Sequence, residues 1–312
     1  MSLRFAAVAL LLARAAEALS AGPLPAGTAP LSAVAPRSMS AVVDEALEAV
    51  RGTDRGVLVD DSKRGRIDAL IRELEASYDG CDALIDARLF RECEVVYVGQ
   101  GTSKTANAAG GRFRGRVGRA LFRTRALYQH VLREGGEDVA VNLVAFRLFG
   151  VLPGVAVLRG SVRTEDDREA LSLKYSRALG PNTIRADFEA PRVSLGPRSW
   201  RLLNLRVGPV STVRLDTTYL DDRVRISRGG SSGTPFIFTA SGRTADADEW
   251  RAVYKSKPAT AKGLAKGGFA AAVLAAVVRR PSVSAVLAVV SLGLYTSTGG
   301  IVENDGTQPM AS

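Results

Sequence analysis

The stretch Leu215–Phe238, which reads LDTTYLDDRVRISRGGSSGTPFIF, decides the fold of this chain. Apolar and polar residues alternate at its start, which is the period of two expected of a half-buried strand. The alternation returns around Val224 and Ile226, and a turn rich in glycine and serine then leads into Pro235–Phe238. Two such runs joined by a glycine turn predict a β-hairpin, and we expect this hairpin to close an antiparallel barrel.

The same stretch resembles the C-terminal signature of the plastid lipid-associated proteins, the fibrillins. In that family a Tyr-Leu-Asp-acidic segment runs into Arg-Ile-Ser-Arg-Gly, a glycine turn and a last strand rich in phenylalanine. The matching residues here are Tyr219, Leu220, Asp221, Arg225, Ile226, Ser227, Arg228 and Gly229. The resemblance implies a lipocalin-like barrel that binds or organises lipids in plastids. We also expect the Asp221–Asp222 pair to bind nearby arginines, Arg223, Arg225 or Arg228, and so to fix the hairpin.

Other segments also resemble the fibrillin pattern. Residues 51–56 match its Gly-Thr-Asp-Arg-Gly turn, and residues 67–75 match its Ile-x-x-Leu-Ile-x-x-Leu-Glu helix. Gln129 and Asn142, on two successive predicted strands, match polar positions. Cys93 stands where the family carries a tryptophan. The resemblance covers roughly residues 42–238 and is densest at the two ends of that range.

Periodicity along the chain predicts two helices and then a series of strands. Apolar residues at helical spacing predict helices over 40–51 and 64–78. Strand-like runs separated by turn residues follow, at the regular spacing of a sandwich or barrel. These runs cover residues 91–97, 126–133, 139–149, 154–162, 170–176, 183–188 and 199–205. We therefore predict a mainly β fold: a lipocalin-like antiparallel β-barrel with N-terminal helices and a C-terminal apolar helical tail.

The N-terminal region has the composition of a targeting leader. Residues 1–20 combine an arginine, a short apolar run and small residues, which predicts a secretory signal peptide. Residues 21–43 are rich in alanine, serine and proline and contain no acidic residue, so they are similar to a transit peptide. Together they predict a bipartite leader to a plastid inside the endomembrane system, the alternative being a secreted protein with a disordered linker. The barrel domain is assigned to residues 44–254.

Residues 255–312 form a basic linker followed by an apolar tail. The apolar segments 268–278 and 283–294 are each shorter than the ~20 residues of a spanning helix. Arg279, Arg280 and Pro281 separate them. One kinked span, two half-inserted helices and helices lying on a membrane surface all fit, against a buried soluble hairpin. The preceding lysines suit anionic lipid headgroups.

The charge balance also favours an anionic partner. The formal net charge is +10, and six arginines lie between positions 112 and 125 with Phe113 and Phe122 among them. Such a stretch suits an anionic membrane surface, single-stranded nucleic acid or a surface loop without a ligand. We expect the membrane surface rather than nucleic acid.

Few residues of this chain suit catalysis. His130 is its single histidine, so every histidine-based triad or metal site would need that residue. Its place in a strand-like run predicts an exposed side chain. The two cysteines, Cys81 and Cys93, lack metal-binding or redox spacing, so we expect free thiols. We predict a protein that is not an enzyme and uses no cofactor or metal.

The barrel interior is the predicted ligand site. Its expected lining consists of Leu143, Ala145, Val155, Val157, Phe188, Ile226, Phe236 and Phe238. A barrel of eight to ten strands holds either one small ligand or a filled core, and both need an apolar lining. By resemblance, the ligand is a carotenoid, quinone, tocopherol or acyl lipid at a thylakoid or plastoglobule surface. The alternatives are an enzyme of plastid lipid or pigment metabolism and a scaffold for a lipid-modifying enzyme.

Overall fold

The structure, a computed structural model, describes residues 37–80, 84–102, 121–198, 203–241, 244 and 246–258. In this part of the chain ten strands form one antiparallel sheet. The strands are β1 (Cys93–Val98), β2 (Phe122–Glu134), β3 (Glu137–Leu148), β4 (Leu152–Thr164), β5 (Thr183–Phe188), β6 (Arg192–Leu195), β7 (Leu203–Arg206), β8 (Ser211–Leu220), β9 (Val224–Gly229) and β10 (Pro235–Ala240). The helical segments are α2 (Met39–Val50), α3 (Asp61–Ala76), η1 (Ala87–Leu89), α5 (Arg168–Tyr175) and α6 (Glu249–Lys255).

The sheet closes on itself as an eight-stranded barrel. The strands follow the order β3-β2-β1-β10-β9-β8-β5-β4, and β4 pairs again with β3. Strand β4 pairs with β6 over residues 154–157 and with β5 over residues 160–164, so the β6–β7 hairpin extends the sheet beside the ring. A mainly β, lipocalin-like barrel was predicted from the sequence, and it is confirmed.

The predicted hairpin at Leu215–Phe238 is present and joins the two ends of the barrel sequence. Strand β9 pairs with β10 so that Ile226 lies opposite Ile237. Strand β10 in turn pairs with β1, the first strand of the domain, with Phe238 opposite Val95. The hairpin therefore links the C-terminal strands to the N-terminal one, as the alternating pattern predicted.

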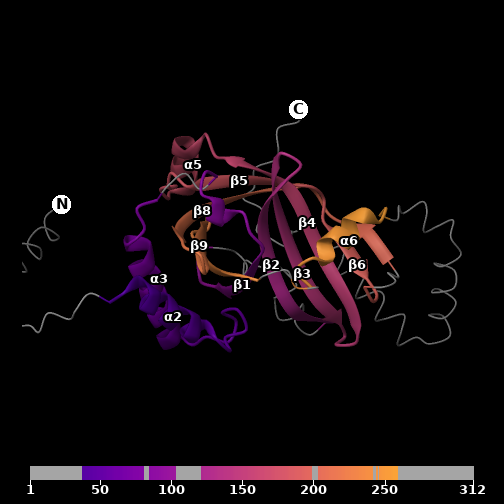
Figure 1. The fold of residues 1–312 in the computed structure, drawn as a ribbon, viewed down its shortest axis with the longest axis horizontal. Helices are drawn as coiled ribbons and strands as arrows, with labels where there is room; N and C mark the ends of the chain where they lie inside the picture. The colour runs from indigo at the N-terminus through magenta and orange to yellow at the C-terminus, as the bar shows by residue number, and fades with distance from the viewer. Residues whose placement is uncertain are drawn as a thin grey trace, which may run out of the picture. The chain divides into compact units, whose positions relative to one another are not determined.

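Helices α2 and α3 cover the outer face of the strands β1, β8, β9 and β10 (Figure 1). Each begins at a capping side chain: Ser38 accepts a hydrogen bond from the backbone of Ala41, and Asp60 accepts one from Lys63. The predicted buried face of the second helix is confirmed, since Ile67, Leu70, Ile71 and Leu74 are all buried. Helix α6 covers β3 and β4.

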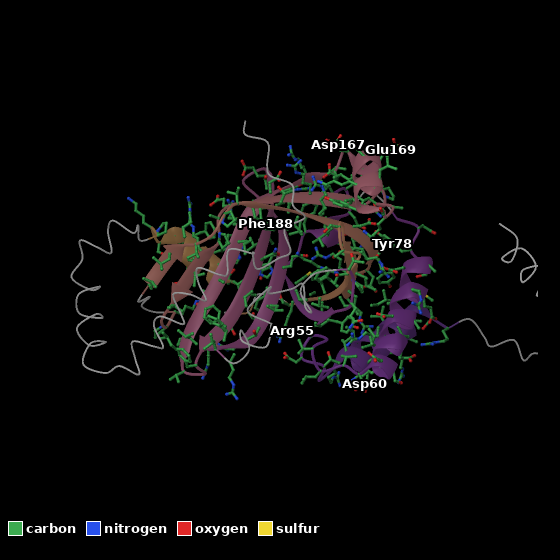
Figure 2. All side chains as sticks on the ribbon, turned by 180° about the vertical axis from the view of Figure 1, so that it is seen from behind. Arg55, Asp60, Tyr78, Asp167, Glu169 and Phe188 are labelled. Atoms are coloured by element: carbon green, nitrogen blue, oxygen red, sulfur yellow. The ribbon has the colours of Figure 1, made fainter. Side chains whose placement is uncertain are left out.

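The turn between α2 and α3 holds these helices to the barrel. Asp54 and Arg55 have positive φ angles of 47° and 56°. The guanidinium of Arg55, which is labelled in Figure 2, donates to Glu94 at 3.0 Å and to the carbonyl of Arg125 at 2.9 Å. A Cβ at Gly56 would lie 2.3 Å from the carbonyl oxygen of Val98, so this position requires glycine. The Gly-Thr-Asp-Arg-Gly motif therefore has a structural role: it attaches the turn between α2 and α3 to the barrel strands.

The predicted series of elements differs from the structure in places. Residues 170–176, expected as a strand, belong to α5, which ends at Ser176 in a left-handed conformation. Leu171 is buried whereas Leu173 is 83% exposed, so their two-residue spacing does not mark one buried face. The strand β6 and the helix α6 were not predicted. The helix predicted over 40–51 is confirmed as α2. Its first turns overlap residues 39–43 at the end of the segment assigned to the leader, and Val42 and Val43 are fully buried there.

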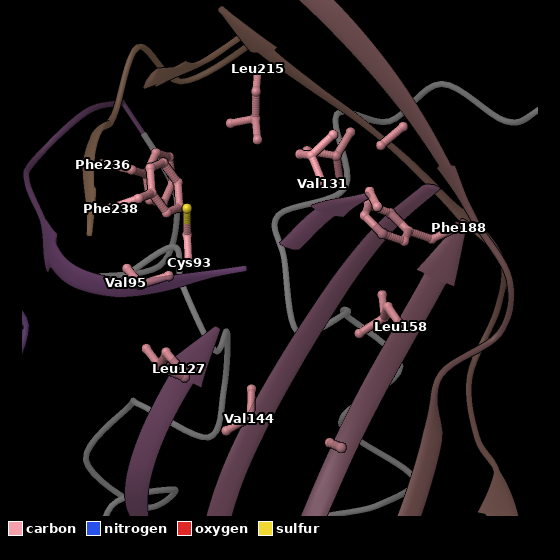
Figure 3. Packing of buried hydrophobic residues seen from close by; sticks show 14 of the residues in the cluster. Cys93, Val95, Leu127, Val131, Val144, Leu158, Phe188, Leu215, Phe236 and Phe238 are labelled. Atoms are coloured by element: carbon pink, nitrogen blue, oxygen red, sulfur yellow. The ribbon is translucent and has the colours of Figure 1, made fainter. Parts of the chain in front are cut away.

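The barrel interior is filled by apolar side chains (Figure 3). They come from every strand of the ring except β9, and Phe188, Phe236 and Phe238 are among the largest. The cavity bordered by Gln129 and Phe188 has a volume of about 10 Å³. That is roughly the space of one water molecule.

Candidate functional site

Three of the predicted lining residues face the barrel interior. Phe188, Phe236 and Phe238 belong to the interior cluster and are at most 7% exposed (Figure 3). The rings of Phe236 and Phe238 stack with their centroids 6.0 Å apart. Phe188 enters the interior from β5, whereas Phe236 and Phe238 enter it from β10, which is separated from β5 by β8 and β9.

The other predicted lining residues face outward. Leu143, Ala145, Val155 and Val157 are buried beneath α6, where they pack against Trp250 and Val253. Their neighbours Val144 and Ala156 face the interior instead. Because β3 and β4 are covered on both faces, apolar residues follow one another along these strands. The sequence therefore shows no alternation that would distinguish the inner face from the outer one.

Ile226 was also misplaced. It is fully buried, but in the layer between the barrel and the helices α2 and α3, together with Ile237 and Tyr97. Its polar neighbours Arg225 and Ser227 are almost completely buried as well, at 1% exposure each. The alternation in this strand therefore marks the helix-covered face as apolar and the inner face as polar.

The acidic residue of the fibrillin-like signature caps a turn. Asp221 accepts hydrogen bonds from the backbone of Arg223 at 2.7 Å and of Val224 at 2.6 Å, and from the Tyr219 hydroxyl at 2.9 Å. The expected pairing of Asp221 with the guanidinium groups was wrong. Because a carboxylate that binds two turn amides fixes the chain direction, Asp221 stabilises the β8–β9 connection.

The remaining signature residues divide between the two faces of the hairpin. Arg228 forms a bidentate pair with Glu75 of α3, at 2.7 and 2.8 Å, and so ties the strand to the helix. Leu220 belongs to the interior cluster. The Ser227 hydroxyl lies 3.4 Å from that of Thr217, and the Gly229 carbonyl accepts a hydrogen bond from Arg177.

Arg225 is the one signature residue that places a charge inside the barrel. Its Nη2 donates to Oε1 of Gln129 at 2.7 Å, and its guanidinium lies 4.1 Å from the ring centroid of Phe238. Its Nε is buried without a hydrogen-bond partner. Among the described residues, no carboxylate pairs with it. Burial lowers the pKa of Arg225 below its usual range, and repulsion from Arg91 lowers it further, against an opposing effect of Cys93.

Two polar side chains share the interior with Arg225. Gln129 and Asn142 lie opposite each other on β2 and β3. Asn142 is 3% exposed, and neither its Oδ1 nor its Nδ2 has a hydrogen-bond partner. We call Arg225, Gln129 and Asn142 the interior polar cluster. Each buried polar group without a partner costs about 1–3 kcal/mol, and a charge costs more.

The three side chains of the interior polar cluster include no carboxylate, imidazole or thiol, and the ionisable group that faces the same interior beside Arg225 is the thiol of Cys93. Glu165 and Asp216, the buried carboxylates of the described chain, lie on the outer face of the barrel near α5. There Glu165 binds Arg214, and Asp216 accepts a hydrogen bond from the backbone of Gly180. Within the described residues no group of three histidine, cysteine or acidic side chains is arranged to hold a metal ion. The cluster suits the binding of a polar or anionic group.

His130 is a buried structural residue, so the predicted exposure was wrong. Its Nδ1 accepts a hydrogen bond from the backbone of Cys93 at 3.1 Å, and its Nε2 lies 3.0 Å from the carbonyl of Ala247. A carbonyl only accepts, so Nε2 carries the proton. Burial lowers the pKa of His130 to about 4. The neutral ring joins β1 and β2 to the segment before α6.

We expect His130 to make the fold sensitive to acid. Between pH 6.5 and about 4 the unfolded chain binds a proton that the folded chain does not. Stability therefore falls as the pH falls through this window, by about 1.4 kcal/mol per pH unit and about 3 kcal/mol in all. Urea unfolding at several pH values measures this slope. The variant His130→Gln keeps a donor and an acceptor but does not titrate, and it should lose that part of the slope. Equal slopes in both proteins would contradict the assignment.

The other predicted features are only partly covered by the described residues. Phe122 packs inside the barrel against Phe146, with ring centroids 5.2 Å apart, so it does not offer a stacking surface. Arg125 pairs with Asp246 at 2.8 Å.

Cys93 is a buried free thiol. Cys81, residues 103–120, the leader up to residue 36 and the apolar tail lie outside the described residues. Within the described part, none of the helices has both the length and the apolar character of a membrane span.

Comparison with known proteins adds no identification. Neither the protein-family models nor the curated proteins nor the solved structures contain a match to this chain. The argument for function therefore rests on the barrel interior.

Proposed function

We propose that this protein binds hydrophobic or amphipathic molecules inside its barrel and does so without catalysis. The observation that carries the proposal is a closed barrel with an apolar interior that also holds Arg225, a buried cation without an acidic partner among the described residues. A filled core needs apolar side chains but gains nothing from an unpaired charge. A ligand that satisfies the polar groups explains why they are there.

The proposed setting is the plastid. The fibrillin resemblance and the bipartite leader support thylakoid or plastoglobule surfaces as the place where the protein organises carotenoids, quinones or acyl lipids. The net charge of +10 supports contact with an anionic membrane surface.

Ligand binding requires the interior to open. The cavity of about 10 Å³ is far below the roughly 300–1,000 Å³ of pockets that hold small molecules. Interior side chains must therefore move apart, and this step slows association. We expect association rate constants below about 10⁵ M⁻¹s⁻¹.

The test is the lipid content of the protein purified from its native membranes. Mass spectrometry should find one lipid class in near-stoichiometric amount. The variant Ala186→Leu enlarges a side chain at the interior cavity and should lose this lipid, whereas Leu173→Ala on the exposed face of α5 should keep it. Overpacking costs about 1–3 kcal/mol, so thermal unfolding must show that Ala186→Leu is folded. If the purified protein carries no more of any lipid than an unrelated protein purified from the same membrane extract, the proposal is refuted.

A scaffold for a lipid-biosynthetic enzyme is the second candidate. The small cavity favours it, as do apolar side chains at the surface, Val151 at 78% and Leu173 at 83% exposure. The same purification distinguishes the two functions, because a scaffold should carry the enzyme and no defined lipid.

A further inference from the structure

We propose that the ligand of the barrel carries an anionic oxygen head group, and that Arg225 and Asn142 bind this group. The inference rests on the proposed function and names the class of ligand: a long-chain molecule with a carboxylate or phosphate at one end.

The first argument is the charge of Arg225. The guanidinium is 1% exposed, and its hydrogen-bonded partner, the amide oxygen of Gln129, is neutral. By contrast, Arg214, the other arginine of the described chain that is buried to this degree, has the carboxylate of Glu165 beside it. A buried charge costs several kcal/mol when no opposite charge compensates it. An anionic head group supplies that compensation.

The second argument is the unused hydrogen-bonding capacity beside the charge. The Nε of Arg225 and both polar atoms of Asn142 are buried without partners. Asn142 lies opposite Gln129, which holds the guanidinium, so these groups come from neighbouring positions of the barrel wall. A guanidinium offers parallel donors that match the two oxygens of a carboxylate or phosphate, and the Asn142 amide adds another donor.

A third argument concerns Arg91, which lies near enough to Arg225 to lower its pKa. Its Nη1 donates to the carbonyl of Asp222 at 2.7 Å, while its Nε and Nη2 are buried without partners. Two guanidinium groups close together repel each other unless an anion lies between or beside them. The charge of Arg91 therefore adds to the positive potential at Arg225.

The apolar surroundings indicate that the anion carries a chain. The ring of Phe238 adjoins Arg225, and Phe236 stacks on Phe238. The same interior cluster includes Val131, Leu215 and Leu158 (Figure 3). Burying methylene groups there gains about 0.8 kcal/mol each. A free inorganic anion would not use this surface.

Binding by the full chain to three long-chain probes tests the inference: oleate, its neutral analogue oleyl alcohol, and the lysophosphatidate with the same chain. We expect wild type to bind oleate about ten- to a hundredfold more tightly than oleyl alcohol. Arg225→Gln should remove that preference and change the affinity for the alcohol less than about threefold. Arg163→Gln is the matched control, because it removes an arginine that is 60% exposed on the same barrel and should alter neither affinity.

Each outcome decides between the claims. Equal binding of oleate and oleyl alcohol by wild type, or an equal loss of both in Arg225→Gln, overturns the inference and leaves the proposed function standing. Failure to bind any of the three probes overturns the inference. A defined carotenoid or quinone in the natively purified protein would then still support the proposed function, and the lack of any defined lipid there would overturn both. Tighter, Arg225-dependent binding of lysophosphatidate supports the inference and identifies phosphate as the head group. Inorganic phosphate that binds as tightly as lysophosphatidate overturns it, because no chain is then recognised.

A second variant guards against failure of Arg225→Gln to fold. Asn142→Leu keeps the branched shape and the number of side-chain heavy atoms and removes the polar amide. We expect it to weaken oleate binding severalfold and to leave oleyl alcohol binding unchanged. Unchanged oleate binding in a folded Asn142→Leu protein would remove Asn142 from the site and overturn the inference as stated.

Discussion

Replacement of Ile226 by aspartate should prevent the barrel domain from folding. The side chain is fully buried between β9 and the helices α2 and α3, where Ile71 and Ile237 belong to the same cluster. A buried carboxylate without a partner costs several kcal/mol, and loss of the isoleucine packing costs about 2–5 kcal/mol more. The sum is comparable to the roughly 5–15 kcal/mol that holds a domain together. Soluble yield and thermal unfolding measure the effect.

Controls for Ile226→Asp show where the residue acts. Leu173→Asp, at a position that is 83% exposed, should leave the melting temperature unchanged. The milder Ile226→Ala should increase hydrogen exchange in α3 more than in β3, because Ile226 packs under the helices and not in the barrel core. A soluble Ile226→Asp protein with the wild-type melting temperature would contradict the packing described above.

Removal of the Glu165 carboxylate should destabilise the domain by about 3–5 kcal/mol. Glu165 and Arg214 are 3% and 4% exposed, and Nε of Arg214 donates to Oε2 of Glu165. The other oxygen of Glu165 accepts a hydrogen bond from the backbone of Asp167, directly before α5. In Glu165→Leu the guanidinium stays buried without its counter-ion. Urea unfolding gives the change in free energy.

The double variant Glu165→Leu/Arg214→Met tests the reason for this loss. It removes both charges, so we expect it to recover most of the stability lost in the single variant. Glu45→Leu breaks the surface pair with Arg66, whose side chain is 65% exposed, and should cost less than about 1 kcal/mol. Equal stability of the single and double variants would show that the buried charge of Arg214 is not the cause.

The sequence by itself determined the elements that repeat a clear period. The alternation and glycine turn of Leu215–Phe238 predicted the β9–β10 hairpin, and the spacing of Ile67 to Leu74 predicted the buried face of α3. The regular succession of short strands predicted the barrel. These features depend on local backbone geometry, in which side chains repeat every two residues in a strand and every 3.6 in a helix. Segments of seven residues such as 170–176 are too short for that distinction, and one of them became α5.

Only the tertiary structure decided which face of each strand is the inside of the barrel. A period of two shows that two faces differ, but it does not say which one faces the core. In β9 the helices α2 and α3 cover the apolar side, so Ile226 lies outside and Arg225 inside. In β3 and β4 the cover of α6 makes both faces apolar and hides the alternation. The position of the interior polar cluster therefore depends on packing between distant segments. Where helices bury the outer face of a strand, neither face is exposed and polar, so the sequence pattern cannot show which face points into the barrel.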